Sequence, residues 1–254
     1  MCLIVLAWQA HPDYRLVVAA NRDEFRARPS SPVHWWTDVP NILAGRDLEA
    51  GGTWMGITRQ GRFAALTNYR DPSGHRPGAP SRGTLVRDCL SGGADTEPAL
   101  RELASVSGQY VGFNLFLSDG RTLGIHESTT AAVRKLEPGI YGLSNHVLDT
   151  DWPKLKRARS RFAEALKTLP DTGPVLELLR DRTPAPDQEL PRTGVSLEWE
   201  RMLSPVFIDR SDYGTRCSSL ILAGHDGHTR FTEWTWNDEG ALHSEVEHQF
   251  RSTL

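Results

Sequence analysis

The second residue of the chain is a cysteine, and its position could give it a chemistry that Cys89 and Cys217 lack. Removal of Met1 would leave a thiol and a free α-amino group on one residue. Because an α-amino group titrates at about 7.7–8.0, it is partly neutral at pH 7 and can take the proton of the neighbouring thiol. Cys2 could therefore supply both nucleophile and base. The alternative is a small buried residue that begins a strand, since free cysteines are among the most buried residues.

Four consecutive polar residues, Asn21-Arg22-Asp23-Glu24, follow the apolar segment 16–20. A polar cluster directly after an apolar strand brings several hydrogen-bonding groups to one end of a sheet. Such a cluster could orient a thiolate or bind a carboxylate. The alternative is a solvated turn in which an acid caps a short helix through Phe25.

Amide and guanidinium side chains also occur in or beside three further apolar segments. Asn68 lies near the end of segment 62–70 and Asn145 follows segment 140–144. Side-chain amides in such places are suitable donors to a developing oxyanion, although surface turns would explain them equally well. Arg216 lies in an apolar stretch, where a charged group needs a partner, and a carboxylate from Asp23 or Glu24 is the expected one.

Four side chains are candidates for ligand binding: Arg22, Trp54, Tyr69 and Arg70. Trp54 follows a glycine pair in the segment 51–56, a pattern typical of backbone that closely approaches a ligand or another strand. A tight turn that enters a strand is the alternative. Tyr69 and Arg70 end the same strand-like segment that contains Asn68.

Alternating and β-branched patterns predict an antiparallel hairpin at the start of the chain, with strands at both ends of the sequence and helices between. We expect one α/β domain over residues 1–254, without repeats. The predicted strands are 2–8, 16–20, 53–58, 62–67, 110–118, 122–126, 140–144, 206–208, 215–223 and 229–236, and the predicted helices are 84–90, 98–104, 154–169 and 174–179.

Composition limits the classes of function. Of the 254 residues, 39% are hydrophobic, and a net charge of −3 provides no basic excess for nucleic acid, so we expect no nucleic-acid partner. Three cysteines without a CxxC pair argue against a disulfide framework and a zinc site, so we expect no metal and a cytoplasmic location. No segment approaches the roughly 20 apolar residues needed to cross a bilayer, so no integral membrane segment is expected.

Several motifs together resemble the NRDE family, also called the Transport and Golgi organisation protein 2 family, and the resemblance covers nearly the whole chain. That family is similar in layout to the choloylglycine hydrolase and penicillin V acylase group. The resemblance implies an α+β fold, a four-layer αββα sandwich of two mainly antiparallel sheets, with an N-terminal cysteine nucleophile. The motifs are Met-Cys at the start, Asn21-Arg22-Asp23-Glu24, Gly51-Gly52-Thr53-Trp54, Leu66-Thr67-Asn68-Tyr69-Arg70, Ser81-Arg82-Gly83 and Gly214-Thr215-Arg216-Cys217-Ser218.

The resemblance also implies roles for individual residues. Asn21, Asp23 or Glu24 would hold the Cys2 amine, Asn68 and Asn145 would face the oxyanion, and Arg216 would be paired near the thiolate. The acylases place an Arg three residues before an Asp, whereas Asn21 stands three residues before Glu24 here. Which acid takes which role therefore stays open.

Two functions of different classes follow. The first is an N-terminal-cysteine amidohydrolase or acyl hydrolase that cleaves a non-peptide C–N bond of a small molecule and needs no cofactor. The second, implied by the family resemblance, is a non-catalytic protein that binds and carries haem, acyl-CoA or lipid. Eight tryptophans, with Trp35-Trp36 beside His34, would suit a flat ligand such as haem, and no CxxCH attachment motif is present.

Overall fold

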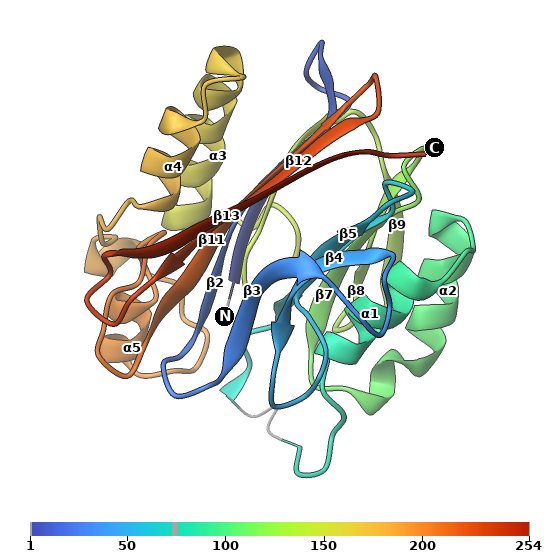
Figure 1. Cartoon of the computed structure of the whole chain (residues 1–254). Helices are drawn as coiled ribbons and strands as arrows, with labels where there is room; N and C mark the ends of the chain where they lie inside the picture. The colour runs from blue at the N-terminus through green and yellow to red at the C-terminus, as the bar shows by residue number, and fades with distance from the viewer. Residues whose placement is uncertain (1, 73–75, 254) are drawn as a thin grey trace.

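A computed structural model describes residues 2–72 and 76–253. Two antiparallel sheets lie face to face, and helices cover the outer face of each (Figure 1). This is the four-layer α+β sandwich that the family resemblance implied. The chain begins on an inner strand of one sheet, so residues near its start lie between other elements.

The first sheet has the strand order β10-β1-β2-β11-β12-β13. The predicted hairpin forms its centre, where β1 pairs with β2 and β2 pairs with β11. Every residue of β1 is buried, because this strand is covered by helices on one face and by the second sheet on the other. The strands are β1 (Cys2–Trp8), β2 (Tyr14–Phe25), β10 (Gly139–Leu143), β11 (Tyr213–Gly224), β12 (His228–Trp236) and β13 (Leu242–Arg251).

The second sheet has the order β3-β4-β5-β6-β7-β8-β9, so each strand pairs with its neighbour in the sequence. This is the antiparallel meander that the short links between the predicted strands indicated. The strands are β3 (Ser30–Trp35), β4 (Ile42–Asp47), β5 (Met55–Thr58), β6 (Phe63–Asn68), β7 (Phe113–Ser118), β8 (Leu123–Glu127) and β9 (Ala132–Leu136).

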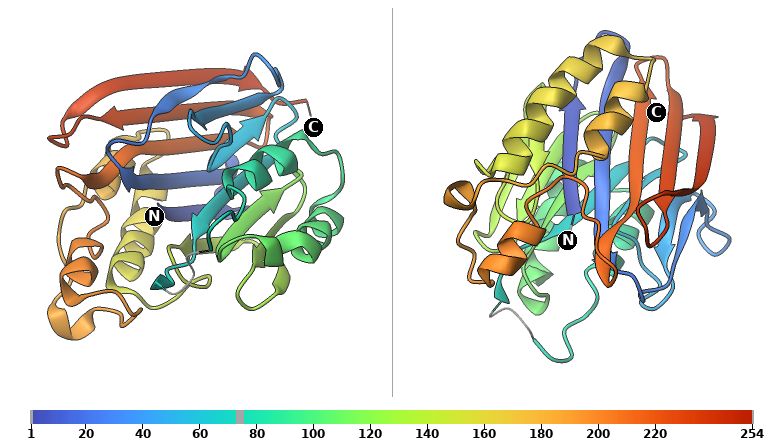
Figure 2. Two further views of the ribbon diagram at one scale, coloured as in Figure 1. Left: turned by 90° about the horizontal axis from the view of Figure 1, so that it is seen from below. Right: turned by 90° about the vertical axis from the view of Figure 1, so that its left-hand side faces the viewer.

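Three apolar layers hold the sandwich together. Side chains alternate along β1, so Ile4 and Leu6 pack between the sheets while Leu3 and Val5 pack against helices. A third layer lies between the second sheet and its helices, around Leu115. Full burial of such a side chain contributes about 1.5–3 kcal/mol. The helices are α1 (Gly83–Ser91) and α2 (Thr96–Val106) on the second sheet, and α3 (Pro153–Ala165) and α4 (Gly173–Leu179) on the first, with the short α5 (Leu197–Met202) near α3 (Figure 2).

Most predicted elements are confirmed to within a few residues, and the differences have physical causes. Residues 206–208 form no strand, because their backbone turns away before a single bridge between Asp209 and Gly214. The predicted helix 154–169 ends at Ala165 and continues only as a 3-10 turn. The polar residues 21–24 lie inside β2 and not in a turn after it. None of the helices in the described part of the chain is long and apolar enough to cross a bilayer.

Candidate functional site

A cleft of about 950 Å³ opens at the end of the sandwich where β1 begins. Cys2 pairs with Arg22 across β1 and β2, and Arg22 pairs with Cys217 across β2 and β11. Directly opposed residues on adjacent strands point to the same face of a sheet. These three side chains therefore form a row on the inner face of the first sheet, and all three line the cleft.

The Cys2 thiol is buried at the wall of this cleft. Burial raises its pKa, and the charges of Asp23 and Glu24 act in the same direction while that of Arg22 opposes them. The resting thiol is therefore protonated at neutral pH and needs a base before it can act as a nucleophile. The charge of Cys2 also acts on the guanidinium of Arg82, a residue of the cleft lining.

Asp23 lies beside the start of β1. Cys2 pairs with Arg22, and Asp23 is the next residue of β2. Its carboxylate accepts a hydrogen bond of 2.7 Å from Thr215 Oγ1, and its carbonyl accepts one of 3.2 Å from the Tyr213 hydroxyl. Burial raises the pKa of Asp23, whereas the charge of the chain's amino terminus, the charge of Lys154, the Thr215 hydrogen bond and the charge of Arg22 lower it, in that order.

Glu24 lies differently from Asp23. It is partly exposed at the cleft, accepts a hydrogen bond from the Phe25 amide and lies 3.7 Å from the Arg22 guanidinium. The sequence left open whether Asp23 or Glu24 would hold the Cys2 amine. Of the two, Asp23 is the one beside the start of β1, where a Cys2 α-amino group would lie.

Asn21 points away from the cleft, contrary to its expected role. Its Nδ2 donates to the carbonyl oxygens of Leu179 at 2.8 Å and Val206 at 2.9 Å, and its Oδ1 accepts from Ser218 Oγ at 2.6 Å. The cause is strand alternation, which turns Asn21 toward the helices while Arg22 faces the second sheet. Asn21 therefore joins β2 to α4 and to the segment around Val206.

The two oxyanion candidates are separated by the structure. Asn68, at the end of β6, lines the cleft. Asn145 is fully buried, and its Nδ2 donates to the Asn68 carbonyl at 3.0 Å while its Oδ1 accepts from Ser144 Oγ. Asn145 therefore supports the backbone of Asn68, and Asn68 is the one of the two amides that lines the cleft.

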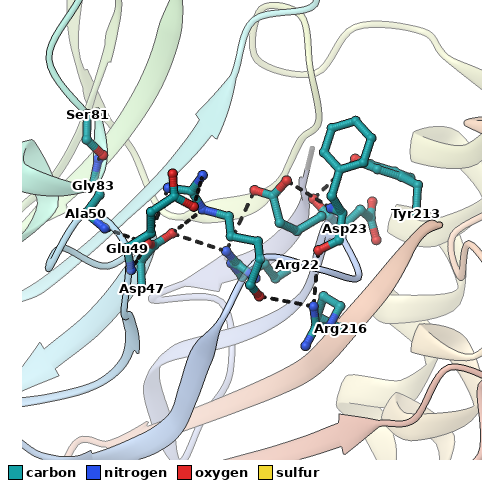
Figure 3. A network of polar contacts seen from close by, with 12 residues as sticks. Arg22, Asp23, Asp47, Glu49, Ala50, Ser81, Gly83, Tyr213 and Arg216 are labelled. Carbon is teal, nitrogen blue, oxygen red and sulfur yellow. Dashed lines mark hydrogen bonds and ion pairs between the residues drawn. The ribbon is translucent and has the colours of Figure 1, made fainter.

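Arg216 has carbonyl partners, not the expected carboxylate of Asp23 or Glu24. Its Nη1 donates to the carbonyl oxygens of Phe25 at 3.1 Å, Arg26 at 2.6 Å and Arg28 at 3.2 Å (Figure 3). The register between β11 and β2 shifts at Arg216, which displaces this side chain from the row that contains Cys217. Arg216 closes the turn between β2 and β3 at the edge of the cleft.

Of the four predicted ligand-binding residues, Arg22 and Trp54 line the cleft. Arg22 lies 3.5 Å from the Asp47 carboxylate, and its buried Nη1 has no hydrogen-bond partner within the residues that the structure describes. Tyr69 and Arg70 lie outside the described cleft lining. The Tyr69 ring packs against the His146 ring, and Arg70 is buried in an ion pair with Glu200.

The sequence reasoning missed three charged residues of this region: Arg82, Glu233 and Lys154. Arg82 belongs to the Ser81-Arg82-Gly83 motif, which was visible, but its loop carried no ligand signature. Buried Glu233 lines the cleft and accepts a hydrogen bond from the Val33 amide. Lys154 lay in a helix prediction, where nothing in the sequence relates it to Cys2. In the described residues, no group of three or more His, Cys, Asp or Glu side chains could hold a metal ion.

The arrangement of two sheets between helix layers is that of the N-terminal-nucleophile hydrolases. The conjugated bile acid hydrolase of Clostridium perfringens, solved as its C2A mutant, superimposes with a TM-score of 0.51 over 99% of this chain and 92% of the hydrolase, at 9% identity. At that identity the likeness shows the fold alone.

The sequence comparisons define the family. The model of the Transport and Golgi organisation 2 family matches residues 1–238, and the chain belongs to this family. The Transport and Golgi organization protein 2 homolog of Homo sapiens is 35% identical over 271 residues, with 97% of both chains covered. The homolog of Bos taurus is 37% identical over 259 residues, with 92% of both chains covered.

Proposed function

We propose that this protein hydrolyses a non-peptide C–N bond of a small molecule, with Cys2 as the nucleophile after removal of Met1. One observation carries the proposal. The Cys2 side chain lines the cleft, and Asp23, which follows the residue paired with Cys2, lines the same cleft at the start of β1, where removal of Met1 would free the Cys2 amine. The nucleophilic thiol of Cys2, the α-amino group that acts as its base, and the Asp23 carboxylate that accepts a hydrogen bond from this amino group then lie together at the end of β1.

The reaction proceeds through a thioester. The α-amino group, held by Asp23, takes the thiol proton, and the sulfur attacks the amide carbonyl carbon. The side-chain amide of Asn68 donates to the oxyanion. Collapse of the tetrahedral intermediate breaks the C–N bond, and the leaving amine takes the proton from the α-ammonium group. Water then attacks the thioester, which releases the carboxylic acid and restores the thiol.

The arginines of the cleft favour a substrate that carries a negative charge near the scissile bond. Arg28 is held by Asp47, Arg46 makes two 2.7 Å hydrogen bonds to its own carboxylate partner, and Arg216 is held by carbonyls. Within the part of the chain that the structure describes, the buried Nη1 of Arg22 has no hydrogen-bond partner, and Arg82 donates from Nη1 to the Gly112 carbonyl at 3.1 Å. The charge of Arg22 acts on Cys2, and that of Cys2 acts on Arg82. A carboxylate or phosphate is the group that guanidinium donors bind best.

The test begins with the intact mass of protein produced without an N-terminal tag, which reports whether Met1 is removed. Amide substrates with and without a carboxylate are then screened with wild-type protein, Cys2→Ala and Cys89→Ala. Cys89 is the matched control, because it lies on α1 outside the described cleft lining and burial raises its pKa to about 11. Cys2→Ala should lower turnover at least about 10³-fold, and Cys89→Ala should leave it within about twofold. Equal turnover in both variants would refute the proposal.

Reversible binding of haem or an acyl-CoA without chemistry is the second candidate, favoured by the size of the cleft and its arginines. Haem with an axial protein ligand does not fit the residues present. The described cleft lining contains no histidine, and burial raises the pKa of both its thiols, Cys2 and Cys217. A haem would have to be held through its propionates by Arg22 or Arg82 and through its ring by Trp54.

A further inference from the structure

The described lining of the cleft contains six arginines, and they are not equally available to a ligand. Both terminal nitrogens of Arg46 donate to Asp38 at 2.7 Å. Arg28 donates to Asp47 from Nε at 2.6 Å and from Nη2 at 3.3 Å. In three others Nη1 donates to a backbone carbonyl oxygen: Arg76, Arg82 and Arg216.

The sixth arginine, Arg22, is buried and incompletely paired. It is only 8% exposed, and its Nη1 has no hydrogen-bond partner within the described residues. Its Nη2 lies 3.5 Å from the Asp47 carboxylate and 3.7 Å from that of Glu24, longer than an ordinary hydrogen bond in both cases (Figure 3). A buried charged donor without a partner is destabilising, so a ligand oxygen at Nη1 would be bound favourably.

Arg22 brings this donor close to the Cys2 thiol. The two residues are directly opposed on β1 and β2, so their Cβ atoms lie about 4.5–5.5 Å apart. Asp47, which faces the guanidinium, belongs to β4 of the second sheet, so the Arg22 side chain reaches across the cleft from one sheet toward the other. An anion bound at Nη1 therefore lies close to a carbonyl carbon that the Cys2 sulfur attacks.

The charges of the cleft favour a ligand with a single negative charge. Against its six arginines, the described lining has five Asp or Glu residues, so one formal positive charge is left over. Charges removed from water are stable when they are balanced. One carboxylate neutralises the excess, whereas a phosphate dianion would reverse it. A guanidinium also forms strong, charge-assisted hydrogen bonds with a carboxylate.

We propose that Arg22 determines the substrate specificity of the site: its Nη1 binds a carboxylate that the substrate carries close to the scissile amide, as an N-acyl amino acid does. The inference rests on the proposed function, because it assigns the substrate class of the Cys2 reaction. Arg22 holds a group that does not react, while Cys2 and Asn68 act on the carbonyl. Loss of Arg22 lowers the affinity for charged substrates and leaves that for uncharged ones.

The first measurement is equilibrium binding to the full chain carrying Cys2→Ala, which cannot consume its ligand through the thiol. The probes are N-benzoylglycine and N-benzoylglycinamide, which differ in the carboxylate and share a ring that suits Trp54 of the cleft. Their dissociation constants are measured by ligand-observed NMR. N-benzoylglycine should bind at least about tenfold more tightly, as expected for a hydrogen bond between charged groups. Equal affinities, or no binding of either probe, would overturn the inference.

Two variants in the Cys2→Ala background separate Arg22 from the general charge of the cleft. Arg22→Gln should reduce the preference for the carboxylate to within about twofold and leave the affinity for the amide probe unchanged. Arg46→Gln is the matched control, because it removes the same charge from the same lining while its terminal nitrogens are held by Asp38. It should keep the full preference. A preference lost equally in both variants would show a general electrostatic attraction and overturn the assignment to Arg22.

Arg22→Lys covers the case in which Arg22→Gln does not fold. Lysine keeps the charge but lacks the planar pair of donors, so the preference for the carboxylate should fall at least about threefold. An unchanged preference in Arg22→Lys would contradict a carboxylate bound at Nη1.

Turnover distinguishes this inference from the proposed function. In an active enzyme, Arg22→Gln should raise KM for N-acyl amino acids about tenfold and change kcat less than about twofold, because Arg22 binds substrate and transition state alike. If wild-type protein cleaves amides through Cys2 without preferring a carboxylate, only the present inference fails. If the binding preference depends on Arg22 but Cys2→Ala and Cys89→Ala turn over amides equally, the proposed function fails and the carboxylate site stands.

Discussion

Replacement of Asn21 by leucine tests whether this residue stabilises the fold or takes part in the reaction. Its side chain makes three buried hydrogen bonds, to the carbonyls of Leu179 and Val206 and from the hydroxyl of Ser218. Leucine has a similar volume but cannot make any of them. At about 1–1.5 kcal/mol for each lost bond, with buried groups left unpaired, Asn21→Leu should lower the free energy of unfolding by about 3–5 kcal/mol.

The assay is urea unfolding followed by tryptophan fluorescence, together with the thermal midpoint. For a chain of this size, about 3–5 kcal/mol corresponds to a midpoint lower by about 6–20 °C. Asp23→Asn, two residues away in β2, is the comparison: it should slow turnover of the amide substrate. A stable Asn21→Leu protein with slow turnover would contradict the separation of roles, because Asn21 would then act on the reaction and not on the fold.

Three further perturbations follow from the same geometry. Arg70→Met leaves the Glu200 carboxylate buried without its cation and should cost about 3–5 kcal/mol of stability; the double variant Arg70→Met/Glu200→Leu should recover part of that loss in thermal unfolding. Burial raises the pKa of Glu233 above its ordinary 4.5, so the folded protein binds this proton more tightly than the unfolded chain, and the stability so gained is lost as pH rises through the folded-state pKa. Glu233→Gln should therefore gain stability relative to wild type as pH rises from 4.5 toward neutrality, and a constant difference in urea midpoint would contradict this. Haemin should give no saturable Soret shift of the kind expected from an axial protein ligand, and a shift abolished by Cys2→Ala would instead identify a thiolate ligand.

The sequence predicted most elements that are buried on one or two faces and missed several that are largely solvated. β4 was also missed, because its buried apolar run of Ile42, Leu43 and Ala44 is only three residues long. β1 has the predicted bounds because its seven residues are all buried and apolar. β13 was missed because it is an edge strand whose residues are all exposed or half-buried, and only Val246 and Phe250 are apolar among its half-buried positions. β3 is likewise an edge strand, with a proline and only Val33 fully buried. A pattern that depends on burial cannot identify strands that are largely solvated.

The candidate site was predicted in outline for a similar reason. Cys2 and the polar cluster at 21–24 could be placed near one another because one hairpin contains both. The partners of Arg216 could not be predicted, because they depend on a register shift between β2 and β11, two strands almost 200 residues apart in the chain. The buried ion pair of Arg70 and Glu200 joins segments 130 residues apart, and no local pattern reports such a meeting.

The alternation of β2 explains how four consecutive residues contribute to two different environments. Arg22 faces the cleft beside Cys2, whereas Asn21 faces the helices. Asp23 is buried, belongs to the cleft lining and accepts a hydrogen bond from Thr215. The charges of Asp23 and Glu24 both raise the pKa of the Cys2 thiol, so neither acid favours the thiolate through its charge alone. In the proposed reaction Asp23 assists the nucleophile only by holding the ammonium group that forms when the amine takes the thiol proton.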